Sequence, residues 1–207
     1  MVQAQELDLI RVYRVPFSTN VERVALAAGH KGIPVEWIDV DPDDRSAVER
    51  ASGQPLVPVL VQGDEVVADS PRILDWLEAR TPEPPLYPRE PARRAEAAVF
   101  VQWFNHVWKG PPNELLVTDD AARRAELVDR MHASVAIFEG LLDGRDFLLG
   151  DFGIADVVAF PFLKYAAFGL PDGDDELFHR ILAEHLPLRP GSPLHAWAER
   201  VDARPRA

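Results

Sequence analysis

Two short motifs in the first half of the chain carry groups that could bind a small peptide. Val57-Pro58 opens an apolar stretch that runs to Val61, and Asp69-Ser70 precedes a predicted helix. Proline has no backbone N–H, so it fits only the edge or the first position of a strand. If the Val57-Pro58 bond is cis, the N–H and C=O of Val57 point outward and can pair with an extended peptide.

The Asp69-Ser70 pair adds groups that suit the charged end of a peptide. The Ser70 hydroxyl and the free N–H groups of a helix N-terminus attract a carboxylate, and the Asp69 carboxylate can hold an ammonium group. Each motif also has an ordinary explanation, because prolines are common at the start of strands and an Asp-Ser pair before a helix often serves only as a cap. Their combination is what indicates a site for a small peptide with a zwitterionic end.

The composition restricts the chemistry that such a site could perform. The chain has no cysteine, which excludes disulfides, thiolate metal sites and a cysteine nucleophile, so any reacting thiol must come from a ligand. The six histidines include no closely spaced ligand pair, and we expect no metal and no cofactor other than the bound peptide.

Charge and hydropathy exclude further classes of partner. The net charge of −12 opposes binding to nucleic acid and to anionic membranes, whose affinities come largely from Lys and Arg. The sequence has no uninterrupted apolar stretch of about 18 residues, and its first residues lack a signal-peptide pattern. We therefore expect a folded cytoplasmic protein, with 207 residues and a 47% apolar composition that suffice for two small domains.

The motifs lie in a segment whose periodicity predicts an α/β domain over residues 1–81. The predicted order is βαβαββα, with Gly63-Asp64 as the turn of a hairpin and Pro71 in the first turn of the last helix. Strands are expected at 7–15, 33–40, 56–61 and 65–68, and helices at 21–28, 43–51 and from 71 onward. A proline at the start of the third strand makes this a thioredoxin-like arrangement.

The second half of the chain shows only helical periodicity. Residues 82–91 are rich in proline and predict a stiff linker, and residues 92–207 predict an all-helical bundle domain. Helices are expected at 92–109, 121–142, 155–170, 174–186 and 193–203. Asp156 stands three residues after Gly153, which is the capping-box spacing, and predicts the start of a central buried helix with a folding role and no catalytic one.

Both halves together resemble the glutathione transferases, which combine a thioredoxin-like domain with a helical one. The stretch from Ser18-Thr19-Asn20 to Val24 resembles the serine-type classes, particularly phi and more distantly theta. The resemblance implies Ser18 as the catalytic residue and a homodimer that joins glutathione to a small hydrophobic electrophile or reduces peroxides in detoxification. It implies a glutathione site formed by Val57, Pro58, Asp69, Ser70 and Arg45, and a second-substrate pocket formed by Phe17, Trp103, Val107 and Trp108.

Physical chemistry gives Ser18 an independent rationale. A thiol with a pKa of about 8.5 is mostly protonated at neutral pH, and its thiolate is the nucleophile. A hydroxyl donor together with a helix N-terminus would favour the thiolate. In the other interpretation Ser18 only caps that helix, and Thr19 or Asn20 could share the catalytic role or take it over.

Two departures from the family pattern keep a second function open. Leu56 occupies a position where the family often has Gln or Lys, and the second helix lacks the His-Lys pair of the phi class, which leaves Arg45 as the nearby cation. The alternatives are a protein that keeps the fold for binding or interaction without catalysis, and a transferase that uses another small thiol. The aromatic residues near Trp103 could equally be core or subunit interface.

Overall fold

The computed structural model describes residues 9–186 and 188–207, and these form two compact units. The first unit contains residues 9–86 together with Arg204–Ala207, and the second contains the described residues of Tyr87–Ala203. The last four residues, which we expected in the helical domain, therefore group with the first unit. Residues 7 and 8 of the predicted first strand lie outside the described part of the chain.

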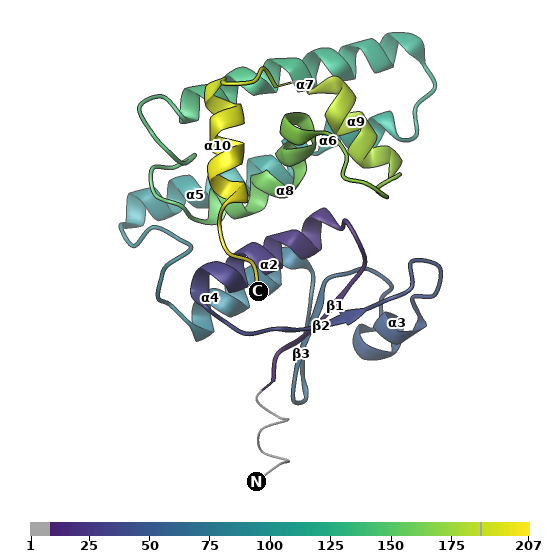
Figure 1. The fold of residues 1–207 in the computed structure, drawn as a ribbon, viewed down its shortest axis with the longest axis vertical. Helices are drawn as coiled ribbons and strands as arrows, with labels where there is room; N and C mark the ends of the chain where they lie inside the picture. Colours follow the sequence, from purple (N-terminus) through teal and green to yellow (C-terminus); the bar gives the residue numbers. More distant parts are fainter. Residues whose placement is uncertain (1–8, 187) are drawn as a thin grey trace. The chain divides into compact units, whose positions relative to one another are not determined.

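The first unit is a thioredoxin-like mixed sheet with helices, as the sequence predicts. The observed order is β1 (Arg11–Arg14), α2 (Thr19–Lys31), β2 (Glu36–Asp39), α3 (Ser46–Ser52), β3 (Val59–Gln62), β4 (Glu65–Ala68) and α4 (Ser70–Arg80). The strands follow the order β2-β1-β3-β4 across the sheet, with β1 parallel to β2 and antiparallel to β3. Figure 1 labels β1, β2 and β3 together with the helices α2, α3 and α4 of this unit. Apart from β4 the strands are shorter than predicted: β1 and β2 begin later and end earlier, and β3 begins at Val59 and ends at Gln62.

The two faces of this sheet bury different side chains because successive residues in a strand point to opposite faces. Val12 and Leu60 are fully buried and share one face, and α2 packs against α4. On the other face Val59 packs against Val48 of α3 and against Tyr13. The loop that leads into β3 is thereby fixed next to α3.

Residues Arg204–Ala207 lie along α2. The N–H of Ala207 donates to the carbonyl of Ala25 at 3.1 Å, and the indole N–H of Trp37 donates to the carbonyl of Ala207 at 2.9 Å. At the other end of this segment a guanidinium nitrogen of Arg204 lies 3.3 Å from Nδ1 of His30, whose pKa is lowered chiefly by burial. The segment therefore completes the first unit although it follows the last helix of the chain.

The second unit consists of helices. They are α5 (Pro91–Trp103), η1 (Phe104–Trp108), α6 (Gly110–Leu115), α7 (Ala121–Leu141), α8 (Ile154–Phe168), α9 (Leu177–His185) and α10 (Pro193–Asp202). The predicted helix 92–109 changes to a π-helical turn at η1, where the Lys109 N–H reaches the Phe104 carbonyl. Phe104 and Trp108 stack with ring centres 4.5 Å apart, so the turn places both rings in the core.

Helix α8 is buried along almost its whole length, as its apolar sequence predicts. The predicted capping box is present, because the Asp156 carboxylate accepts the Gly153 N–H at 3.0 Å. Asp156 also accepts the Leu148 N–H at 3.0 Å and the Trp197 indole N–H at 2.7 Å. Burial raises the pKa of Asp156 to about 6 although these hydrogen bonds favour the carboxylate. Through the Trp197 indole, Asp156 thus also connects the start of α8 to α10.

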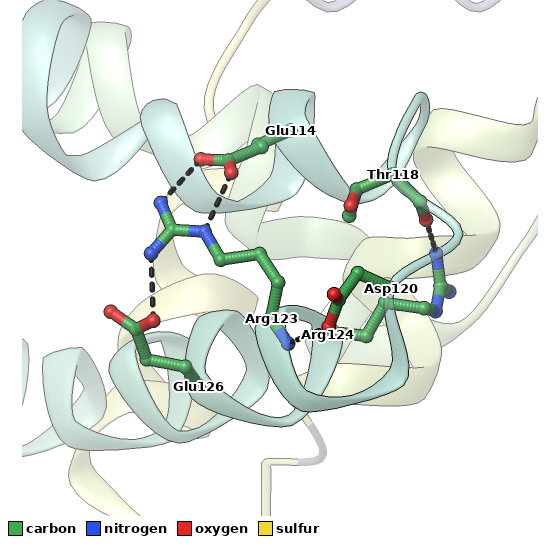
Figure 2. Close-up of polar contacts among 6 residues, drawn as sticks. All are labelled: Glu114, Thr118, Asp120, Arg123, Arg124 and Glu126. Atoms are coloured by element: carbon green, nitrogen blue, oxygen red, sulfur yellow. Dashed lines mark hydrogen bonds and ion pairs between the residues drawn. The ribbon is translucent and has the colours of Figure 1, made fainter.

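An arginine clamp joins α6 to the start of α7 (Figure 2). Arg123 donates to both carboxylate oxygens of Glu114, at 2.6 and 2.7 Å, and to Glu126 at 2.7 Å. Asp120 caps α7 through the Arg123 N–H, and Arg124 donates to the Thr118 carbonyl. These bonds fix the turn between the two helices.

Within the described residues, no helix of either unit is long and apolar enough to cross a membrane.

Candidate functional site

Four chain segments meet at one end of the sheet. Arg14 pairs with Asp39, and Tyr13 pairs with Val59, which in turn pairs with Ala68. Continuing this register by one to three residues brings together the ends of β1, β2 and β4 and the start of β3. The four segments follow the order of the strands across this end of the sheet. They are residues 40–45 after β2, Phe17-Ser18 after β1, Leu56-Val57 before β3, and Asp69-Ser70 after β4.

The Val57-Pro58 peptide bond is cis. Pro58 is buried and Val57 is half-buried. In the described part of the chain neither backbone group of Val57 takes part in a hydrogen bond. Among the described residues, both groups are therefore unpaired.

Ser18 is the N-cap of α2, and its hydroxyl oxygen accepts the Val21 N–H at 3.4 Å. A hydroxyl has one proton to donate in addition to its acceptor positions, so this cap leaves the O–H free to donate to a second partner. The preceding residue, Phe17, has a φ of 60° and is 37% exposed. The positive end of α2 and the Ser18 hydroxyl thus lie at the same corner of the sheet.

The two alternatives to Ser18 have different surroundings. Thr19 is 7% exposed and faces the interior of the unit. Asn20 is half-buried, and its side-chain carbonyl accepts the Ser70 hydroxyl at 3.4 Å. Ser18 is therefore the hydroxyl at this corner that is both accessible and able to donate.

Asp69 and Ser70 are held differently from each other. Asp69 is exposed, has a φ of 79° and makes no side-chain cap to α4, so its carboxylate is accessible to a ligand. Ser70 is 1% exposed, and its hydroxyl bonds Asn20 and lies 3.5 Å from Nη1 of Arg23. A ligand carboxylate at this point would meet the N-terminus of α4 with the Ser70 hydroxyl behind it.

Arg23 is the functional candidate that the sequence analysis missed. It lies in α2, is 1% exposed, and burial lowers its pKa to about 9 while Asp69 acts in the opposite direction. The guanidinium is charged at neutral pH and lies beneath the Asp69-Ser70 turn. An arginine within the buried stretch of α2 that includes Val24 and Leu26 was a signal for such a role.

Arg45 and Leu56 lie at the far side of the site. Nε of Arg45 donates to the Pro42 carbonyl at 3.0 Å, so the guanidinium is held over its own loop. Leu56 is 72% exposed, and the Gln54 side chain bonds both backbone groups of Leu56.

The helical unit contains an apolar hollow of about 200 Å³. Three of the four residues predicted for the second-substrate pocket, Trp103, Val107 and Trp108, line it together with Met131 and Ile137. The fourth predicted residue, Phe17, belongs to the first unit. The Trp108 indole donates to the Ser134 hydroxyl at 3.0 Å, which fixes one wall of the hollow.

Sequence comparison places both units in one family. Residues 12–85 match the model of the glutathione S-transferase N-terminal domain, and residues 121–200 match that of the C-terminal domain. The chain belongs to the glutathione S-transferase family. Its relatives include FtsZ-localized protein A of Caulobacter vibrioides, which is 31% identical over 162 residues, 67% of this chain and 68% of that protein.

The other comparisons give lower sequence identities. Glutathione S-transferase U6 of Arabidopsis thaliana is 25% identical over 77% of this chain and 71% of its own length. The solved structure of a tau-class glutathione S-transferase from mango, Mangifera indica, superposes with a TM-score of 0.80 over 97% of this chain and 90% of that one, at 18% identity. FzlA from C. crescentus superposes with a TM-score of 0.65 over 90% of each chain, at 24% identity. The structural likeness supports the glutathione S-transferase fold.

Proposed function

We propose that this protein is a glutathione transferase in which the Ser18 hydroxyl stabilises the glutathione thiolate. The observation that carries the proposal is the position of Ser18. Its hydroxyl caps α2 through an acceptor position, keeps its proton for another partner, and shares one end of the sheet with Val57 and Asp69.

The thiolate would gain from two local features. A hydrogen bond from Ser18 to an anionic sulfur contributes about 1.5–3 kcal/mol, which lowers a thiol pKa by about one to two units. The N-terminus of α2 adds a favourable field of about 0.3–1 kcal/mol. A thiol with an ordinary pKa of about 8.5 would then be largely ionised at neutral pH.

The rest of glutathione would be held by backbone and charge. The backbone groups of Val57 suit the cysteinyl peptide unit, because they offer one donor and one acceptor at the side of the sheet. The exposed Asp69 carboxylate suits the γ-glutamyl ammonium, and the α4 N-terminus at Ser70 suits the γ-glutamyl carboxylate. Pro58 fixes the position of Val57, and no cofactor or metal is required for this reaction.

The second substrate would be a small hydrophobic electrophile. The hollow lined by Trp103, Val107 and Trp108 supports this proposal, since aromatic and aliphatic walls favour an apolar body. Phe17 offers a further exposed apolar surface next to Ser18. Conjugation of such compounds, or reduction of peroxides, would make the protein part of cytoplasmic detoxification, where thiols remain reduced.

The deciding experiment is Ser18→Ala, compared with Ser192→Ala as a matched control. Ser192 caps α10 by accepting the His195 N–H at 3.2 Å, so the control removes the same kind of cap in the other unit. We expect Ser18→Ala to raise the pKa of bound glutathione by about one to two units and to lower turnover of an aryl electrophile, with a smaller loss of binding. Equal turnover in the two variants would overturn the role of Ser18.

A second candidate function is binding or interaction without catalysis. It is favoured by the relationship to FtsZ-localized protein A and by the exposed Leu56 at the edge of the site. Titration calorimetry with millimolar glutathione separates the two. Glutathione binding that Asp69→Ala weakens, together with turnover of an aryl electrophile, supports the transferase. Binding without turnover supports the non-catalytic protein, and a lack of binding leaves the interaction protein or a transferase for another thiol.

A further inference from the structure

The far side of the site carries a negative charge where a second carboxylate of the thiol substrate would lie. This side consists of residues 40–56, which leave β2, form α3 and return to β3. This segment contains four carboxylates and two arginines, which gives it a formal charge of −2. Asp41, Asp43 and Asp44 are exposed in the loop that directly follows β2.

The spacing of the strands shows how far a bound tripeptide extends along this end of the sheet. Strands lie about 4.8 Å apart, so the end of β2 lies three spacings, about 14 Å, from Asp69 at the end of β4. A tripeptide extends about 10–11 Å. If its γ-glutamyl end lies at Asp69 and its sulfur at Ser18, its last residue lies beyond β1, within reach of side chains from the loop after β2.

The positive charges near this point do not balance the three carboxylates of the loop, because Arg14 is paired with Asp39 and Arg45 carries only one charge. Arg45 donates through Nε to the Pro42 carbonyl, and Arg14 of β1 pairs with Asp39 at 2.6 Å. The Asp44 carboxylate accepts the Ser46 N–H at the start of α3, and this bond lowers its pKa, so the carboxylate stays ionised. A carboxylate at the far end of the ligand would therefore meet net repulsion.

Leu56 adds a second, independent feature on this side. It is 72% exposed, and its backbone is fixed by the Gln54 side chain, which accepts the Leu56 N–H at 2.6 Å and donates to its carbonyl at 2.8 Å. An exposed leucine side chain offers apolar contact and no hydrogen bond. It suits a ligand end that is uncharged.

We propose that the site prefers a γ-glutamyl thiol whose far end carries no negative charge over glutathione with its free glycyl carboxylate. This preference rests on the proposed transferase function and identifies the class of thiol that the same site would use. It arises from the loop at 41–45 together with Leu56, and not from Ser18 or Asp69, which contact the other parts of the ligand.

The test compares glutathione with its C-terminal amide, which differs only by the lost carboxylate charge. We expect kcat/KM for a generic aryl electrophile to be about three- to tenfold higher with the amide at low salt, and the ratio to shrink at about 0.5 M salt because exposed charges are screened. Calorimetry with each thiol should give the same order of affinity.

A variant that removes charge from the loop tests whether residues 41–45 cause the preference for the amide. Asp41→Asn combined with Asp43→Asn keeps the side-chain oxygen that accepts the Asp43 N–H and removes two negative charges. It should bring the two thiols to near-equal kcat/KM. Asp119→Asn combined with Asp129→Asn, two exposed positions of the helical unit, makes the same charge change elsewhere and should leave the ratio unchanged.

The outcomes separate this inference from the proposed function. If both thiols are turned over and kcat/KM for glutathione equals or exceeds that for the amide, the preference is overturned. The proposed transferase function is then unaffected. No turnover with either thiol overturns the transferase, and the ratio of the two binding constants then still decides the preference. An amide preference that survives in the loop variant contradicts its assignment to residues 41–45.

Discussion

The carbonyl oxygen of Pro205 lies 2.2 Å from the position that a Cβ atom on Gly29 would take. Gly29 is in α2, so the helix and the segment Arg204–Ala207 approach each other more closely than any other residue would allow. Backbone atoms cannot yield to a methyl group as a flexible side chain can, and the contact therefore makes a specific prediction.

Gly29→Ala should displace the segment from α2 and destabilise the protein. Overpacking at a close backbone contact costs about 1–3 kcal/mol, which outweighs the higher helix propensity of alanine. The matched control is Gly140→Ala in α7, where a Cβ meets nothing within 4 Å and the substitution should stabilise by about 0.5–1 kcal/mol. Chemical unfolding measures both, and Trp37 fluorescence reports loss of the bond to Ala207. Equal effects at the two glycines would contradict the contact.

Asp156 should give the protein an unusual dependence of stability on pH. Its pKa is raised from an ordinary value of 3.8 to about 6, so the folded state binds a proton more readily than the unfolded state. The favourable contribution is complete below the ordinary pKa and is lost as pH rises through about 6.

Comparison of the wild type with Asp156→Asn isolates this effect. The stability difference between them should shift by about 1–3 kcal/mol between acidic and neutral pH, with the wild type relatively more stable at the acidic end. Asp146→Asn serves as a control, because the Asp146 side chain is 81% exposed. A difference that is constant with pH would show that Asp156 has an ordinary pKa in the folded protein.

Arg23 should act as a positioning residue for the Asp69-Ser70 turn. Arg23→Met removes the buried guanidinium next to the Ser70 hydroxyl, and the disturbed hydrogen bonds should cost about 1–3 kcal/mol of stability. We also expect weaker glutathione binding and a higher pKa of the bound thiol, because a nearby positive charge is lost. Arg23→Lys should restore the thiol pKa more than the stability. A variant that loses only stability would reduce Arg23 to a structural role.

The homodimer proposed from the family leads to a surface prediction. Val99 of α5 is 69% exposed and lies outside the hollow that Val107 and Ile137 line. If the surface around Val99 forms the interface, Val99→Glu should shift the protein from dimer to monomer in light scattering. Val117→Glu is the control, since Val117 is 81% exposed in the turn between α6 and α7. A wild-type monomer would contradict the proposal directly.

Local sequence patterns determined the order of the elements and the outline of the site. The periodicity of 121–142 gave α7 almost to the residue, and the Gly153-Asp156 spacing gave the start of α8. Such features depend on neighbours a few residues away, which the sequence shows directly. The motifs at Val57-Pro58 and Asp69-Ser70 were visible for the same reason.

Only the tertiary structure decided features that depend on residues far apart in the chain. Arg23 meets Ser70 across 47 residues, and Asp156 meets Trp197 across 41. Packing decides that Arg204–Ala207 associates with α2. Strand register decides that the loop after β2 lies next to the site. Helical or strand periodicity carries no information about such distant pairs, because it reports which face of an element is apolar and not which partner covers it.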